Sequence, residues 1–348
     1  MPCYHPLIRI EKLGEYNRAK DGHLYNKATI VTAGMWDHEF MKDTGYVKKE
    51  LIPCGKCIGC RLDYSREWAN RGFLEAKLWE QNWFCTVTYN EDYIDIPEFV
   101  EDPSGITYCN EGEWGGTLVP ADLTAFIKSL RQIMKREYNQ DGIRFMACGE
   151  YGSETERPHY HIIFFNLNLP VEDLYKPRLI NKNIYYQSHI IERAWGGKGI
   201  CNISEASWNN IAYTARYITK KINGKTAEEY YASKGQIKEF LRVSRMPGIG
   251  EGYYRKHWEE IYKNDEIIVK NMSGTVSSKP PKYFDKLLER EHPEIWEDVK
   301  ARRKQQAKNG EKIKDTQTSI SRYERLQIEE RTKDEKNQQL VRYFEKSL

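Results

Sequence analysis

The chain has 348 residues and a net charge of +3, with 39% hydrophobic and 30% charged residues. This length and composition suit one large domain or two ordinary ones with a buried core, and they exclude a disordered chain. No run approaches the ~20 apolar residues of a membrane helix, and the first residues lack an apolar signal core. We therefore expect a cytoplasmic protein with reduced thiols and no membrane partner.

Local patterns predict a mixture of helices and strands in the middle of the chain. Apolar residues at helical spacing predict helices over 66–81, 120–138, 189–195 and 204–222, with Ser204 as the cap of the last. β-Branched and aromatic runs predict strands over 82–89, 143–150 and 159–165. Residues 1–65 show neither pattern and are expected to be irregular. The segment from residue 282 onward has a helical pattern, without a core face after residue 300.

These patterns divide the chain into three predicted parts: a cysteine-containing segment over 1–65, a central domain over 66–260 and a charged, mostly helical extension over 261–348. Residues 300–348 contain 14 Lys and Arg against 8 Asp and Glu. Such a basic tail is typical of segments that bind nucleic acid, although a solvated helix face has the same composition.

Two histidines and a glutamate form a candidate metal site in the predicted hairpin. His159 and His161 alternate in a strand, so both side chains point to one face, with Cβ atoms roughly 7 Å apart. Glu150 ends the preceding strand and is the natural third ligand. Two imidazoles and one carboxylate leave coordination positions open for substrate oxygens, but a zinc hydrolase has a similar ligand set. Imidazoles favour Mn²⁺, Co²⁺ or Zn²⁺ by affinity, and Mg²⁺ can compete through its abundance.

A predicted helix carries two tyrosines on one face. Tyr213 and Tyr217 are four residues apart, and Lys220 and Lys221 follow within a turn. Taken alone, this pattern is better explained by an ordinary amphipathic helix with two tyrosines at the edge of the core and two solvated lysines. The chemical interpretation is that an ammonium and a metal-polarised phosphate help a tyrosine, whose ordinary pKa is near 10, to attack a phosphodiester.

Together these residues resemble the HUH endonuclease superfamily, and within it the replication initiators of microviruses of the gokushovirus branch. The matching segments are GEYG (149–152), RPHYH (157–161), YTARYITK (213–220), CGKCIGC (54–60) and SRMPGIG (244–250). The resemblance covers residues 1–260. One position departs from it, because Tyr160 stands between the two histidines in place of an aliphatic residue. We expect its side chain to face away from the metal ligands.

The resemblance implies an α+β fold of the RRM or ferredoxin-like type. A central antiparallel sheet of about five strands is flanked by helices, and a helical C-terminal extension follows. Residues 86–88 would lie in the central strand, and residues 66–260 would form the nicking domain.

The resemblance also implies roles for the site residues. His159, His161 and Glu150 would bind Mg²⁺ or Mn²⁺, Tyr213 and Tyr217 would be the nucleophiles, and Lys220 would assist at the phosphate. The enzyme would nick and rejoin single-stranded origin DNA through a 5′-phosphotyrosine, in rolling-circle replication of a circular phage genome in the host bacterial cytoplasm. Its partners would be origin DNA and the host polymerase and helicase, since the sequence has no helicase P-loop.

Three cysteines, Cys54, Cys57 and Cys60, lie close together in the first segment. A structural zinc site needs a fourth ligand, which Cys3 or His5 can supply. Three free thiols or an iron–sulfur cluster are the alternatives. Cys85, Cys109, Cys148 and Cys201 are expected to be isolated core or loop residues.

Other functions share parts of this pattern. A plasmid relaxase or a single-strand transposase would use the same metal and tyrosine chemistry. A non-catalytic module would bind single strands by base stacking and phosphate contacts, and its histidines would be incidental.

Overall fold

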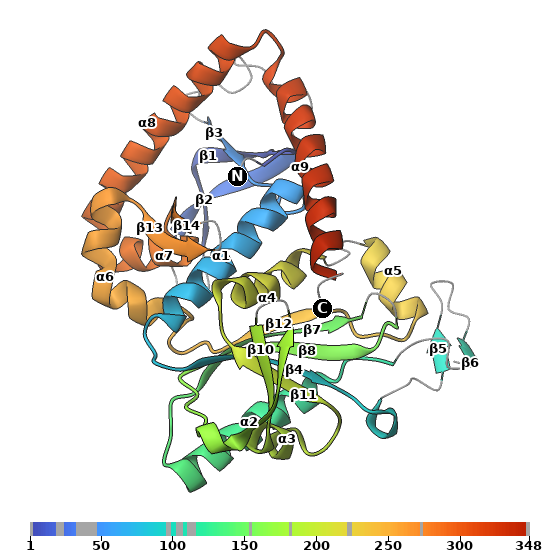
Figure 1. Cartoon of the computed structure of the whole chain (residues 1–348). Helices are drawn as coiled ribbons and strands as arrows, with labels where there is room; N and C mark the ends of the chain where they lie inside the picture. Colours follow the sequence, from blue (N-terminus) through green and yellow to red (C-terminus); the bar gives the residue numbers. More distant parts are fainter. Residues whose placement is uncertain are drawn as a thin grey trace. The chain divides into compact units, whose positions relative to one another are not determined.

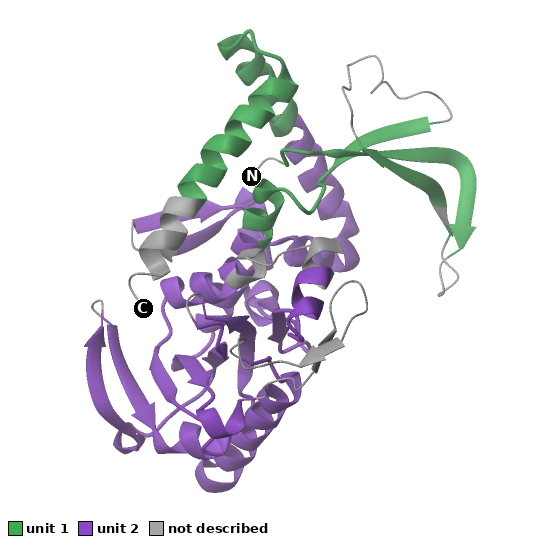
Figure 2. Ribbon diagram, turned by 90° about the vertical axis from the view of Figure 1, so that its right-hand side faces the viewer, with its two compact units in different colours: residues 1–64, 306–346 green, residues 65–305, 347–348 purple. Residues whose placement is uncertain are grey.

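The computed structural model describes residues 3–18, 24–32, 47–94, 99–101, 107–109, 116–152, 155–180, 183–220, 225–271 and 274–345. The chain forms two compact units (Figure 2). Unit 1 comprises Met1–Tyr64 and Gln306–Lys346, and unit 2 comprises Ser65–Gln305 and Ser347–Leu348. The three-part division over 1–65, 66–260 and 261–348 stays a prediction.

A large antiparallel sheet organises unit 2 (Figure 1). Within the described residues it has seven strands in the order β12-β7-β8-β4-β11-β10-β9. Their bounds are β4 (Asn82–Thr88), β7 (Arg144–Tyr151), β8 (Pro158–Phe165), β9 (Leu174–Ile180), β10 (Asn183–Ser188), β11 (Cys201–Glu205) and β12 (Phe240–Val243). The predicted α+β class with a central antiparallel sheet and a helical C-terminal region is confirmed, although the sheet is wider than about five strands.

Helices cover both faces of this sheet (Figure 1). The helices of the chain are α1 (Ile58–Ala76), α2 (Pro120–Tyr138), α3 (His189–Trp195), α4 (Trp208–Lys220), α5 (Lys225–Ser233), α6 (Glu251–Asn264), α7 (Lys282–Glu291), α8 (Pro293–Gln317) and α9 (Arg322–Glu345). One face packs on α2 and α3 and the other packs on α4. Short hairpins are formed by β5 (Phe99–Glu101) with β6 (Thr107–Cys109), and by β13 (Ile267–Asn271) with β14 (Gly274–Ser278).

Side chains along β8 alternate between a face that packs on α2 and α3 and a face that carries the predicted metal ligands. Ile162 and Phe164 are fully buried in the core formed with α2 and α3, whereas Ile163 and Phe165 join the core beneath α4. His161 belongs to the odd-numbered set, so it faces α4. Tyr160 points the other way, and its hydroxyl accepts from Val119 N at 2.8 Å and donates to Val119 O at 2.9 Å. Tyr160 thereby anchors the start of α2.

The expectation of an irregular segment over 1–65 is wrong. Unit 1 contains a three-stranded antiparallel sheet in the order β2-β1-β3, formed by β1 (Leu7–Arg18), β2 (Leu24–Thr32) and β3 (Val47–Ile52). Ile8 pairs with Val31 and Leu51. Charged residues stand on both faces of these strands, and this hides the two-residue period by which a half-buried strand is recognised.

Two helix starts also differ from their predictions. The helix expected from residue 66 begins at Ile58 and ends at Ala76. Ser204 is not a helix cap, because it lies in β11 and pairs with Phe84 of β4. Ser207 has that role instead, since its hydroxyl oxygen accepts a hydrogen bond from Asn210 N at 3.3 Å. Sheet pairing therefore overrides the local capping signal.

The two terminal helices of unit 1 are tied together by ion pairs. Arg325 contacts Glu311 at 3.1 Å and Asp315 at 3.0 Å, and Lys314 contacts Glu329 at 3.4 Å. Part of the charge of the basic tail is therefore compensated within the unit. The nucleic-acid role of the tail stays a prediction.

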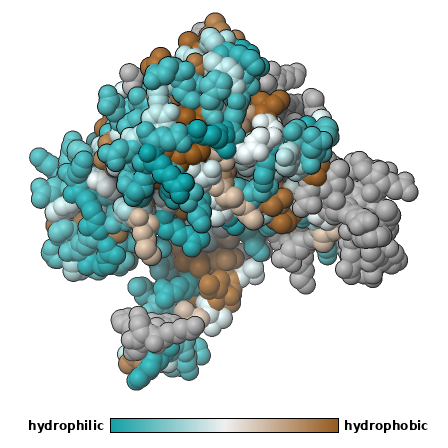
Figure 3. Space-filling view, turned by 90° about the horizontal axis from the view of Figure 1, so that it is seen from below, coloured by the Kyte–Doolittle hydropathy of each residue, from teal (hydrophilic) through white to brown (hydrophobic). Residues whose placement is uncertain are grey.

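The surface drawn in Figure 3 is mostly hydrophilic, with hydrophobic residues in small separate groups. Among the described helices, none combines the length and the hydropathy required to cross a bilayer.

Candidate active site

Three neighbouring strands bring the predicted metal ligands together. Glu150 of β7 is paired directly with His159 of β8, and His161 is paired with Thr86 of β4. Because directly paired residues share a face of the sheet, the glutamate and both histidines project toward α4. The ligand atoms of these three residues all lie within 4.8 Å of one another.

The carboxylate lies between the two imidazoles. Glu150 Oε1 is 2.7 Å from His159 Nε2 and 3.3 Å from His161 Nε2. The two histidine rings are 4.9 Å apart and nearly perpendicular. Glu150 and His161 are each only 4% exposed, so the site is shielded from water on the sheet side.

Neighbouring groups orient both imidazoles. His159 Nδ1 is 3.0 Å from the carbonyl oxygen of Arg157, and a carbonyl only accepts, so Nδ1 carries the proton. His161 Nδ1 is 2.9 Å from Thr86 Oγ1, and its ring stacks on Phe84 at 5.5 Å. Such supporting bonds fix the tautomer and direction of ligating histidines. The orienting role of Thr86 was not predicted, because it depends on strand register.

The electrostatics of the site favour an ionised carboxylate. Burial by itself raises the pKa of Glu150, but the charge of His161 and the hydrogen bond from His159 outweigh it and lower the pKa to about 2. Burial likewise lowers the pKa of His159, and the hydrogen bond to Glu150 reverses this and leaves it raised. A bound cation would replace the proton on His159, since metal binding releases protons from its ligands.

The residues present fit a divalent ion. Glu150 Oε2 is buried and has no hydrogen-bond partner among the described residues, although a buried carboxylate oxygen normally has one. Two ligands at right angles and about 2.1 Å from an ion are separated by about 3.0 Å. The 2.7 and 3.3 Å separations from Glu150 Oε1 bracket that value. The imidazole nitrogens favour Mn²⁺, Co²⁺ or Zn²⁺ by affinity, and the structure identifies no metal.

The helix with the tyrosines lies over this site. α4 packs against β7 and β8. The ring of Tyr213 meets the ring of His161 edge-on, with centroids 5.2 Å apart. Tyr217 and Lys220 occupy the following turns of α4, but their side chains lie outside the described part of the structure, and so does the whole of Lys221.

A glycine sets the distance between α1 and α4. A Cβ atom on Gly72 would lie 2.7 Å from Ile211 Cγ2 and 3.3 Å from Met146 Cε. Ile211 is β-branched and 1% exposed, so it cannot rotate away cheaply. The absence of a side chain at Gly72 therefore allows α1 to pack closely against α4 and β7.

We expect Gly72→Ala to lower the free energy of unfolding by about 1–3 kcal/mol, because it overpacks this contact and displaces α4. Urea denaturation measures the loss. Gly310→Ala is the matched control, since a Cβ at that helical position meets nothing within 4 Å and should stabilise by about 0.5–1 kcal/mol. Equal stability of the Gly72 variant and the wild type would contradict close packing here.

The cysteine candidates come together in unit 1. The sulfur atoms of Cys3, Cys54, Cys57 and Cys60 all lie within 4.8 Å of one another. His5, the alternative fourth ligand, instead contacts Glu330 at 2.6 Å. Cys85, Cys148 and Cys201 are buried and are not disulfide-bonded, and the side chain of Cys109 is outside the described residues.

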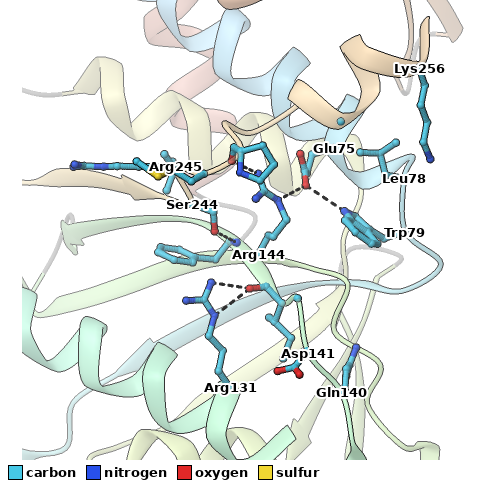
Figure 4. A pocket seen from close by; sticks show the side chains of 17 residues that line it. Glu75, Leu78, Trp79, Arg131, Gln140, Asp141, Arg144, Ser244, Arg245 and Lys256 are labelled. Atoms are coloured by element: carbon cyan, nitrogen blue, oxygen red, sulfur yellow. Dashed lines mark hydrogen bonds and ion pairs between the residues drawn. The ribbon is translucent and has the colours of Figure 1, made fainter. Parts of the chain in front are cut away.

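A pocket of about 820 Å³ lies at the other end of β7 (Figure 4). Residues 244–247 of the SRMPGIG segment form part of its lining, whereas Glu150, His159, His161 and Tyr213 are not among its described lining residues. Glu75 ties its walls together by accepting from Arg144 Nε at 2.6 Å and Gly250 N at 2.7 Å. Arg144 also donates to Pro247 O at 2.7 Å. These contacts give the SRMPGIG segment a structural role.

Both the metal ligands and the tyrosine helix fall within residues 82–222, and these residues match the family model "Replication-associated protein ORF2/G2P". The chain is 36% identical over 302 residues to "Replication-associated protein ORF2" of Spiroplasma virus 4, over 86% of this chain and 82% of that protein. It is 27% identical over 271 residues to "Replication-associated protein VP4" of Bdellovibrio phage phiMH2K, over 75% and 76% of the two chains. It is 26% identical over 242 residues to "Replication-associated protein ORF4" of Chlamydia phage 1, over 68% and 53%.

The chain therefore belongs to the replication-associated protein ORF2/G2P family. The resemblance to microvirus replication proteins noted in the sequence is confirmed. No solved structure matches the chain.

Proposed function

We propose that the chain is a metal-dependent endonuclease and strand transferase that nicks and rejoins single-stranded DNA at a phage origin, through a 5′-phosphotyrosine, to start rolling-circle replication. The observation that carries this proposal is the contact of Tyr213 with His161, which brings a phenol beside a buried His₂Glu cation site. The relatives named as phage replication-associated proteins support the biological setting.

The reaction is a transesterification. The phenol oxygen of Tyr213 or Tyr217 attacks the phosphorus and loses its proton, the bond from phosphorus to the 3′ oxygen breaks, and that oxygen takes up a proton. A phosphodiester is exchanged for another, so the bond energy is retained and no nucleotide cofactor is needed. The 3′ hydroxyl can prime a polymerase, and its later attack on the phosphotyrosine rejoins the strand.

The chain's residues have separate tasks in this scheme. Glu150, His159 and His161 would hold Mg²⁺ or Mn²⁺, which as a Lewis acid polarises the phosphate when bound. Thr86 positions His161. Lys220 would assist at the phosphate, and a second tyrosine one turn away on α4 would allow alternate transfers.

Partners follow from the same scheme. Single-stranded origin DNA is the substrate. A host polymerase would extend the 3′ end, and a host helicase would unwind the duplex, because the sequence has no P-loop. The host bacterial cytoplasm is the compartment in which these partners are available.

A covalent trapping experiment tests the proposal. Overlapping single-stranded fragments of the phage genome are incubated with the full chain and Mn²⁺ or Mg²⁺, and covalent protein–DNA adducts are resolved on a denaturing gel. We expect an adduct on the origin fragment that disappears in Tyr213→Phe/Tyr217→Phe, because both phenols are then lost. Tyr138→Phe, which removes an exposed phenol at the end of α2, should leave the adduct unchanged.

Each other outcome has a definite meaning. An adduct that persists in the double variant would reject these nucleophiles. Metal-independent binding without an adduct on any fragment would favour the non-catalytic module. Cleavage that leaves a free 5′ phosphate and no adduct would indicate a metal-dependent hydrolase.

A further inference from the structure

We infer that Cys3, Cys54, Cys57 and Cys60 bind one structural zinc ion in unit 1. This inference is independent of the proposed nicking reaction, because it concerns different residues in the other compact unit.

The four sulfur atoms have the spacing of ligands around a single ion. Cys54 Sγ is 4.0 Å from Cys60 Sγ, and Cys3 Sγ is 3.9 Å from Cys57 Sγ. Four thiolates at about 2.3 Å from a tetrahedral zinc ion are separated by about 3.8 Å. The observed separations match that edge, and they are about twice the length of a disulfide bond.

Backbone amides are directed at the same sulfur atoms. Tyr4 N donates to Cys57 Sγ at 3.4 Å, and Cys54 N donates to Cys3 Sγ at 3.2 Å. Cys54 Sγ accepts from Lys56 N and Cys57 N, and Cys57 Sγ accepts from Cys60 N. Amides that converge on sulfur stabilise thiolates, the form that binds metal.

The local fold supports the same charge. Gly55 has φ of 73°, which lets the chain turn back so that the next two amides meet Cys54. α1 begins at Ile58, so Cys57 and Cys60 lie at its N-terminus, where the helix dipole favours negative groups. The side chain of one residue far away in the sequence, Cys3, completes the set.

The geometry decides among the three interpretations left open by the sequence. An iron–sulfur cluster must fit several iron and sulfide ions between its cysteines, and sulfurs that all lie within 4.8 Å of one another leave room for one ion. Four unrelated free thiols are not expected to lie together with backbone amides directed at their sulfur atoms. A closed Cys₄ set, with no position for a substrate, is characteristic of structural zinc.

The ion would supply stability that the neighbouring core cannot. The buried hydrophobic cluster here consists only of Tyr4, Cys57, Ile58 and Leu326 among the described residues. Such a small core is normally supplemented by a metal or a disulfide. Through Cys3 and the contact with Leu326, the ion would join the N-terminal segment, the start of α1 and α9 of unit 1.

Elemental analysis of the full chain tests the inference. To remove any contribution from the other site, we would use His159→Ala/His161→Ala, and we expect about one zinc and no iron per chain. Adding Cys57→Ser should remove that zinc, whereas adding Cys201→Ala, which removes a buried thiol elsewhere, should retain it. Iron in place of zinc, or zinc retained in the Cys57 variant, would overturn the inference.

A second measurement on the unmutated chain covers the case in which a cysteine variant fails to fold. Alkylation is mapped by mass spectrometry with and without a strong chelator. Cys3, Cys54 and Cys60 are only partly buried, so as free thiols they would react at once. We expect them to be protected until the chelator is added, and rapid labelling before chelation would refute a bound ion.

Discussion

His161→Ala should abolish nicking, with a loss on the order of 10³-fold or more in the rate of adduct formation. His161 supplies one of the two imidazoles of the predicted metal site, whose three ligand atoms lie within 4.8 Å of one another. Its ring also contacts the ring of Tyr213. Its removal would deprive a bound cation of a ligand and would leave Glu150 with one neighbouring imidazole in place of two. Single-turnover kinetics on the origin strand measure the loss.

Binding of the DNA strand separates this effect from unfolding. Affinity measured by fluorescence anisotropy at fixed salt should change little, because phosphate contacts dominate it. Thr86→Ala is a graded companion, since loss of a group that orients a ligand typically costs 10–100-fold, and Thr86→Ser, which keeps the hydroxyl, should restore most activity. Nicking at the normal rate in His161→Ala would remove the metal centre from the mechanism.

Glu75→Ala should lower the free energy of unfolding of unit 2 by about 3–5 kcal/mol. The carboxylate is 1% exposed and accepts from Gly250 N. It also accepts from Arg144 Nε and Trp79 Nε1 (Figure 4). Removing it leaves a nearly buried guanidinium without its ion partner and a backbone amide without an acceptor. Urea denaturation followed by tryptophan fluorescence measures the change.

Glu80→Ala is the matched control for this effect. Glu80 lies just after α1 and is exposed, so its removal should change stability by less than about 0.5 kcal/mol. If Glu75→Ala were as stable as Glu80→Ala, the ion pair with Arg144 would not hold α1, β7 and the loop before α6 together.

The part of the site that the sequence predicts is the part governed by local periodicity. His159 and His161 could be assigned to one face because strand side chains alternate, and Glu150 because a hairpin sets it beside them. Tyr213 could be assigned to a helix for a similar reason. Its position over His161 depends on how α4 packs, which in turn depends on Gly72, and no pattern in a single sequence reports that contact.

Residues distant in sequence explain the remaining differences. Thr86 orients His161 only because the pairing register of β4 and β8 places the two residues opposite each other. Cys3 was one of two candidates for the fourth ligand position, and only the fold separates it from His5. The additional strands β9 and β12 are short or carry charged and proline residues, so their periodicity is weak. In β1 to β3, charged and apolar residues are mixed on both faces, which hides the alternation in the same way.

Tyr160 links the strand that carries the two histidines to the start of α2 on the opposite face of the sheet. Its phenol holds both the amide and the carbonyl of Val119, directly opposite the strand positions that carry the histidines. An aliphatic replacement would leave the amide of Val119 without its acceptor at the start of α2, at a cost of about 1–3 kcal/mol, whereas the carbonyl would keep its hydrogen bond from Asp122 N. Among related chains, the residue at position 160 should therefore covary with the loop over 117–119. A motif search that requires an aliphatic residue between the two histidines would miss chains with tyrosine at this position.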